Sequence, residues 1–203
     1  MRTRVVLLLL ALGGACKSLE PTREVPLLGS GRVTADFATY TVRRVGLLPM
    51  NDGDDDATMD ESIEQALHAE LVSSTGFEVI PISAADLLEV ESLEPFRRGS
   101  YSPAGLIELR RRFLLDAVFV SAVSSRRVVP PQRLGLQADL ISCETGATLW
   151  SGSVLLDAAD RQTRDALELW SVRYTESAGG AELVLLSPRR FARFAAWQVM
   201  QLL

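Results

Sequence analysis

The sequence predicts an α/β fold, a three-layer sandwich in which one mixed, five-stranded sheet carries helices on both faces. Two apolar runs without polar alternation, at residues 45–49 and 117–123, are typical of central strands that are buried on both faces. An amphipathic helical pattern follows the first run, and a strictly alternating hairpin follows the second. This succession favours helices packed on a largely parallel sheet.

A β-α-β unit is expected over residues 43–82. Apolar residues recur at helical spacing across 59–74, and Gly76 follows as the helix stop. The apolar run at 77–82 returns as a strand, which Pro81 marks as an edge strand. The strand at 117–123 is placed on the other side of the first strand, as its parallel neighbour.

The hairpin over residues 134–156 has a register that follows from matching its inward residues. A three-residue loop, Glu144-Thr145-Gly146, makes every inward residue meet another, and it puts Gly146 where a left-handed residue is needed. The expected pairs are Leu140–Trp150, Ala138–Gly152, Leu136–Val154 and Leu134–Leu156. Numbered along the chain, the five strands take the order 2-1-3-4-5, and the last hairpin is antiparallel.

Further helices are expected at 83–88, at 103–113, at 161–174 and from 188 to the C-terminus, with a loop at 177–186. Ser102-Pro103 and Ser187-Pro188 each place a capping hydroxyl before a proline at the first helical position.

The N-terminus has the pattern of a secretory signal: four residues with two arginines, an apolar run at 5–12 too short to span a bilayer, and small residues leading to Cys16. It resembles a bacterial lipoprotein signal peptide, in which this cysteine becomes the lipidated first residue. Ordinary cleavage near Ala15 is the alternative. By the same resemblance, Lys17 favours the outer membrane. The predicted organisation is a signal peptide at 1–15, a lipidated Cys16 with a tether to residue 41, and one domain at 42–203.

Net charge and composition exclude several function classes. Without residues 1–15, which contain two of the 21 basic residues, 19 basic and 26 acidic residues leave a formal charge of −7. Such a chain is not expected to coat nucleic acid or an anionic bilayer through its net charge. The single histidine, His68, is too little for a metal cluster or a catalytic triad, and Cys143 is expected to be a buried apolar residue. We therefore expect neither an enzyme nor a bound cofactor.

An acidic turn after the first strand is the one suggestive cluster. Its side chains should face two arginines that emerge from the neighbouring strand, in the crevice where open α/β sheets bind ligands. The residues are Asn51, Asp52, Asp54, Asp55, Asp56, Arg126 and Arg127. Alternatively, the carboxylates only stabilise the helix dipole, by about 0.3–1 kcal/mol each.

The C-terminal helix supplies a second candidate, a partner surface. A helical wheel places Arg190, Arg193, Trp197 and Met200 opposite the core side that Phe191 leads. Arginine, methionine and aromatic residues are enriched at interface cores, which favours contact with a partner or a second copy. The alternatives are deep burial of the whole helix, or a cation–π pair in which Arg193 covers Trp197.

Residues 45–49 with 76–80, residues 116–120, and the hairpin at 140–150 with its Thr145-Gly146 and Leu149-Trp150 carry a family resemblance. Together with the lipoprotein-like start, they resemble bacterial envelope lipoproteins that include the activators of penicillin-binding proteins and the curli secretion channel lipoprotein. Residues 187–194 are similar to the ending of an uncharacterised branch. The resemblance implies the fold more firmly than the function.

The function implied by the resemblance is that of a lipid-anchored periplasmic accessory protein, working by protein–protein contact in envelope assembly, secretion or cell-wall synthesis. The alternative is an envelope sensor that binds a ligand in the crevice. A pore is not expected, because the short connections leave no chain length for transmembrane strands.

Overall fold

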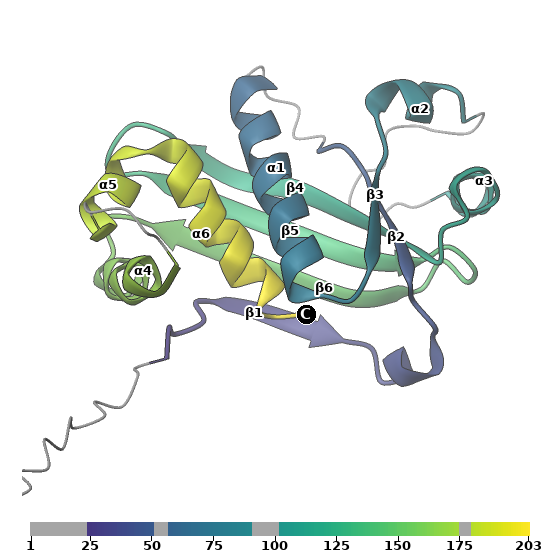
Figure 1. The fold of residues 1–203 in the computed structure, drawn as a ribbon, viewed down its shortest axis with the longest axis horizontal. Helices are drawn as coiled ribbons and strands as arrows, with labels where there is room; N and C mark the ends of the chain where they lie inside the picture. Colours follow the sequence, from purple (N-terminus) through teal and green to yellow (C-terminus); the bar gives the residue numbers. More distant parts are fainter. Residues whose placement is uncertain (1–23, 51–56, 91–101, 175–179) are drawn as a thin grey trace, which may run out of the picture.

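The computed structural model describes residues 24–50, 57–90, 102–174 and 180–203, which form one mixed sheet with helices packed on it (Figure 1). The strands are β1 (Gly29–Val33), β2 (Arg44–Leu47), β3 (Glu78–Pro81), β4 (Ala117–Arg127), β5 (Arg133–Ser142) and β6 (Thr148–Asp157). The α-helices are α1 (Ala57–Ser74), α2 (Ala84–Leu88), α3 (Pro103–Phe113), α4 (Arg161–Tyr174), α5 (Gly180–Leu186) and α6 (Pro188–Met200), and η1 (Phe37–Thr39) is a 3-10 helix.

The predicted α/β class is confirmed, and the predicted strand count is wrong. The strands follow the order β1-β6-β5-β4-β2-β3 in space, so the five predicted strands have their expected order. β2 is parallel to β3 and β4, while β5 and β6 continue the sheet antiparallel. The sixth strand, β1, pairs antiparallel with β6 and lies within the expected tether at 16–41. The sheet therefore begins well before residue 42.

β1 belongs to the sheet because its glycines admit the C-terminal residues at close range. A Cβ atom on Gly31 would lie 2.8 Å from the carbonyl oxygen of Leu202, and one on Gly29 would lie 2.8 Å from Leu202 Cδ1. The indole Nε1 of Trp150 donates to the same Leu202 carbonyl oxygen at 2.7 Å. These glycines serve close packing across the strand, whereas their composition alone suggested a flexible linker.

Gln198 of α6 fastens the segment that precedes β1. Its Oε1 accepts a hydrogen bond from the Leu28 N–H at 2.8 Å, and its Nε2 donates to the Pro26 carbonyl oxygen at 2.9 Å. Gln198 is fully buried, and Val25 is buried in the same core. The chain is therefore part of the folded domain from residue 25 onward.

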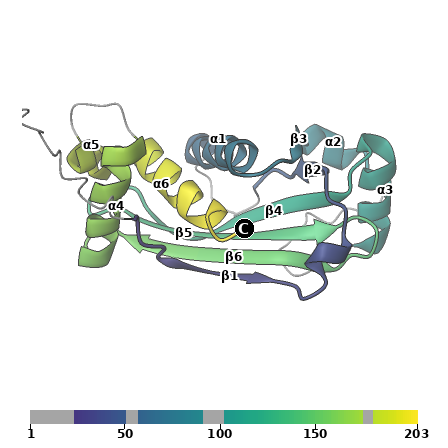
Figure 2. The ribbon, with the colours of Figure 1, turned by 60° about the horizontal axis from the view of Figure 1, so that its bottom comes forward.

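The two faces of the sheet carry separate apolar cores. On one face α1 and α6 lie side by side (Figure 2) and cover a cluster that includes Phe119 and Trp150. Alternate strand residues such as Val118 point the other way and pack with Leu106 and Leu109 of α3. Helices thus contact both faces, and α3 lies at the end where β4 begins.

The register of the β5–β6 hairpin is the one predicted. All four expected pairs are present: Leu140–Trp150, Ala138–Gly152, Leu136–Val154 and Leu134–Leu156. The loop is one residue longer than predicted, because the Ser142 N–H donates to the Ala147 carbonyl oxygen across residues 143–146. An irregularity in the pairing between Leu140 and Ile141 takes up the difference.

Helix starts agree with their sequence signals, with one correction. The hydroxyl groups of Ser102 and Ser187 accept hydrogen bonds from the backbone N–H groups of Gly105 and Arg190. Residues 180–186, expected as a loop, form α5 instead, because the fully buried Val184 ties this segment into the core between α4 and α6.

Gly146→Ala is expected to lower the free energy of unfolding by about 1–2 kcal/mol. Gly146 has φ +72°, and its Cβ would meet only Leu106 Cδ1 at 3.8 Å, so the cost comes from the backbone conformation. Gly76→Ala is the matched control, because a Cβ there meets nothing within 4 Å and Gly76 has no left-handed φ. Urea denaturation measures the free energy of unfolding of both variants. An equal loss for the two would contradict the left-handed backbone conformation of Gly146 as the origin of the cost.

Candidate functional site

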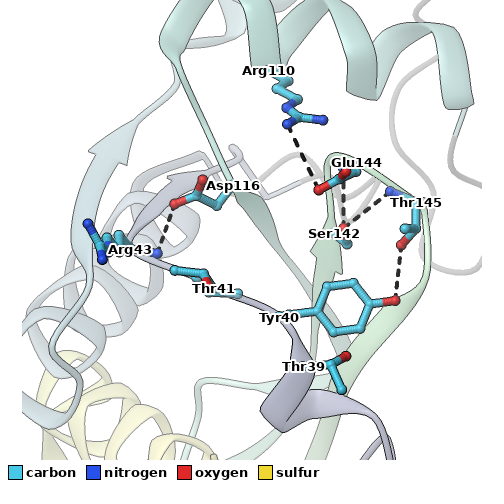
Figure 3. A pocket seen from close by; sticks show the side chains of 10 residues that line it. Thr39, Tyr40, Thr41, Arg43, Arg110, Asp116, Ser142, Glu144 and Thr145 are labelled. Atoms are coloured by element: carbon cyan, nitrogen blue, oxygen red, sulfur yellow. Dashed lines mark hydrogen bonds and ion pairs between the residues drawn. The ribbon is translucent and has the colours of Figure 1, made fainter.

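A half-open pocket of about 660 Å³ lies at the end of the sheet where β2 and β4 begin (Figure 3). Three parts of the chain line it: the segment between η1 and β2, helix α3, and the turn between β5 and β6. The side chains that define its rim are Tyr40, Arg43, Arg110, Glu144 and Thr145, and Asp116 lies between them.

Asp116 fixes the floor of this pocket. One oxygen of its carboxylate, Oδ2, accepts hydrogen bonds from the backbone N–H groups of Arg43 at 2.8 Å and Arg44 at 2.9 Å. Its own carbonyl oxygen accepts from the Cys143 N–H at 2.9 Å. Asp116 therefore joins the start of β2 to the β5–β6 turn, and its role here is structural.

The turn between β5 and β6 is held in a defined shape on the facing wall. The hydroxyl of Ser142 accepts from the backbone N–H groups of Glu144 and Thr145, each at 3.2 Å. The Tyr40 hydroxyl lies 3.4 Å from Thr145 Oγ1, which links the segment after η1 to the turn. The pocket thus has a rigid backbone frame that presents polar side chains outward.

Charged groups on the rim are only loosely engaged with each other. The guanidinium of Arg110 lies 3.9 Å from the Glu144 carboxylate, and both side chains are exposed. Exposed pairs of this kind contribute little to stability, about 0–1 kcal/mol. Arg110 and Glu144 are thus free to exchange this contact for one with a bound group.

The described side chains around the pocket give little support for a nucleophile or a metal site. Burial raises the pKa of the Cys143 thiol to about 12, so this neighbour of the turn is not a nucleophile near neutral pH. Across residues 24–50, 57–90, 102–174 and 180–203, no group of three or more His, Cys, Asp or Glu side chains could hold a metal ion. The arrangement is suited to hydrogen bonding and ion pairing with a polar partner.

The predicted crevice is only half described. Asn51, Asp52, Asp54, Asp55 and Asp56 lie outside the described residues, and Arg126 is half-buried near the end of β4. Arg127 donates to the Pro131 carbonyl oxygen at 2.7 Å and approaches Asp157 within 3.4 Å. Arg127 thus contributes to the turn between β4 and β5, and a ligand site at the acidic turn stays a prediction.

The predicted partner surface on α6 is not an exposed surface. Trp197 is 7% exposed and Met200 3%, and the Trp197 ring contacts Tyr174 at 5.4 Å and Phe194 at 6.5 Å between centroids. The helical wheel was misleading because α1, the sheet and α5 all contact α6. Deep burial, one of the alternatives, applies to these two residues.

The two arginines predicted for that surface have different surroundings. Arg190 is half-buried and Arg193 is exposed. Burial raises the pKa of Glu70 on α1, and the charge of Arg193 acts in the opposite direction. Arg193 therefore lies close enough to α1 to lower the pKa of Glu70, against the effect of burial.

None of the pocket residues was among the predicted site residues. Sequence reasoning placed the site at the carboxyl ends of the parallel strands, whereas the pocket lies at their amino ends. The available signal was the Glu144-Thr145-Gly146 turn, which was used for the register and for the family resemblance but not for a site. Residues 39–43, from the end of η1 to the start of β2, lie mostly in the part of the chain that was expected to be a tether.

Comparison with solved structures identifies PelC from Paraburkholderia phytofirmans, a dodecamer, with TM-score 0.50 and 16% identity over 86% of this chain and 97% of PelC. The lipoprotein GNA1162 from Neisseria meningitidis gives TM-score 0.41 and 20% identity over 56% and 79% of the two chains. The C-terminal domain of LpoB from Escherichia coli gives 0.39 and 20% over 58% and 84%.

The predicted resemblance is confirmed at the level of the fold, which the chain shares with PelC. No protein-family model and no curated protein matches the sequence. No helix in the described part of the chain has both the length and the hydrophobicity needed to cross a membrane.

Proposed function

We propose that the chain is a lipid-anchored periplasmic accessory protein that acts by protein–protein contact in envelope assembly, secretion or cell-wall synthesis. The observation that carries the proposal is the rigid, half-open pocket beside the β5–β6 turn. Its rim offers a phenol, two arginines and a carboxylate at one end of the molecule, on a frame that backbone hydrogen bonds hold in place.

Tyrosine and arginine are enriched at protein interfaces, where they combine apolar contact area with directed hydrogen bonds. A polar segment of another protein suits a half-open pocket with this charged rim better than a compact apolar ligand does. An acidic group on that segment would replace Glu144 as the partner of Arg110, while Tyr40 would pack against its backbone.

The fold supports the same reading. PelC, which has this fold, is a dodecamer, so a second copy of this chain is a natural candidate for the occupant of the pocket. A different envelope protein is the other candidate. The proposed site of lipid attachment is Cys16, at the junction after the apolar run. The resemblance to lipoprotein signal peptides implies that Lys17 favours the outer membrane as the location.

Arg110→Glu is expected to abolish recovery of the partner from detergent-solubilised envelopes, because it places two carboxylates side by side at the rim. Arg111→Glu is the matched control, since Arg111 is an exposed neighbour on α3 that does not line the pocket. Quantitative mass spectrometry of co-purified proteins detects a different envelope protein as the partner. Sedimentation velocity of the purified chain detects a second copy. Equal recovery and equal association state for the two variants would refute the pocket as the contact site.

A further inference from the structure

The anchor, if placed at Cys16, is joined to the domain by a very short stretch of chain. Val25 is already buried in the core, so only residues 17–24 separate Cys16 from the folded part. Fully extended, eight residues span about 26–29 Å. A ten-residue strand such as β5 or β6 is about as long, roughly 33 Å. The end of the molecule where the described chain begins must therefore stay close to the membrane.

That end is formed by α4, α5 and the turn between β4 and β5. Figures 1 and 2 both show the first described residues beside α4. On α6, Gln198 binds Pro26 and Leu28 while the adjacent Trp197 contacts Tyr174 at the end of α4. The Gln132 side chain donates to the Leu185 carbonyl oxygen at 3.0 Å, which holds α5 beside the β4–β5 turn.

Six exposed aliphatic or aromatic side chains lie at this end of the molecule, and Leu88, Ile107 and Leu114 are exposed at the opposite end, at α2 and α3. The six come from every element that forms this end, and several are more than half exposed. The residues are Leu27, Val129, Val172, Tyr174, Leu183 and Leu186. The Arg173 guanidinium lies over the Tyr174 ring at 5.6 Å. Apolar side chains with an aromatic ring and arginines are the combination that favours the boundary between lipid headgroups and acyl chains.

Basic and acidic residues are distributed unevenly along the chain. Residues 161–203, which include α4, α5 and α6, contain six arginines and four carboxylates, whereas residues 16–160 contain 13 basic and 22 acidic side chains. The overall negative charge argues against attraction of the whole chain to an anionic bilayer. Of these six arginines, Arg161, Arg164 and Arg173 lie on α4, and anionic phospholipids attract nearby arginines.

We propose that the end of the molecule formed by α4, α5 and the β4–β5 turn lies against the phospholipid surface that holds the anchor. The inference rests on the lipid anchor of the proposed function and adds an orientation to it. The pocket beside the β5–β6 turn is at the opposite end of the long strands, so it points away from the membrane toward the periplasm.

Fluorescence quenching tests the orientation on the full lipidated chain. Val172→Cys on α4 and Leu88→Cys on α2 form a matched pair, since their side chains are 82% and 88% exposed and lie at opposite ends. Each is labelled with an environment-sensitive fluorophore; the buried Cys143 does not compete, because its thiol is protonated and inaccessible. The vesicles contain phosphatidylethanolamine, phosphatidylglycerol and a phospholipid with a nitroxide on its headgroup.

Quenching is expected to be several-fold stronger at residue 172 than at residue 88. Equal quenching at the two positions, or stronger quenching at 88, overturns the orientation. The mass of the N-terminal peptide is measured in the same preparation. An acylated peptide with equal quenching refutes the orientation alone, whereas a peptide without acyl mass refutes the anchor and the orientation together.

Discussion

Trp150→Ala is expected to lower the free energy of unfolding by about 3–5 kcal/mol. Trp150 is fully buried, and its ring stacks on Phe119 with 6.0 Å between centroids. Its Nε1 also donates to the Leu202 carbonyl oxygen, the atom that lies over Gly31 of β1. The substitution therefore leaves a cavity in the main core and releases the C-terminal residues from the edge of the sheet.

Trp150→Phe separates these two contributions, because it keeps an aromatic ring and removes the donor. It is expected to cost about 1–3 kcal/mol, the range for a buried polar group that loses its partner. Urea denaturation followed by circular dichroism gives both values. If Trp150→Ala lowered the free energy of unfolding by less than Trp150→Phe does, the assignment of Trp150 to the centre of the core would be contradicted.

Gln198→Ala is expected to cost about 2–4 kcal/mol, because it leaves both the Leu28 N–H and the Pro26 carbonyl oxygen without their present partners. The loss is expected to be local. The free energy of local opening, measured by hydrogen exchange at the amides of residues 28–33, should fall by the same amount. Amides of β4 and β5 are expected to exchange only through global unfolding.

Gln201→Ala is the matched control for this variant. Gln201 is an exposed glutamine three residues further along, at the end of the same helix. It is expected to change stability by less than about 0.5 kcal/mol. Unchanged exchange at residues 28–33 in the Gln198 variant would show that β1 is held by other contacts. Released β1 would also lengthen the tether, so this variant is expected to lose the difference in quenching between residues 172 and 88.

The strand order and hairpin register were predictable because they depend on local patterns. Alternation along residues 134–140 and 150–156 fixes which side chains face inward, and Gly146 marks the position of the turn but not its length. β1 was not predictable in this way. Its sequence, Gly-Ser-Gly-Arg-Val, has the composition of a linker, and its place in the sheet depends on Leu202, about 170 residues away.

The candidate site shows the same limit. Two of its walls could be placed from the sequence, α3 and the β5–β6 turn, but the third, between η1 and β2, lies mostly in the segment that was predicted to be a tether. The helical wheel of α6 correctly gave Phe191 a core position, yet the burial of Trp197 depends on Tyr174 at the end of another helix. Periodicity identifies an apolar face; it does not say how many neighbours will cover the rest of the helix.

Mass spectrometry of the N-terminal peptide of the mature protein, isolated from membranes, decides whether the chain is anchored as proposed. The account predicts a peptide that begins at Cys16 and carries acyl mass, and a Cys16→Ser variant that leaves the membrane fraction. A wild-type peptide that begins at another residue, or begins at Cys16 without acyl mass, would contradict it.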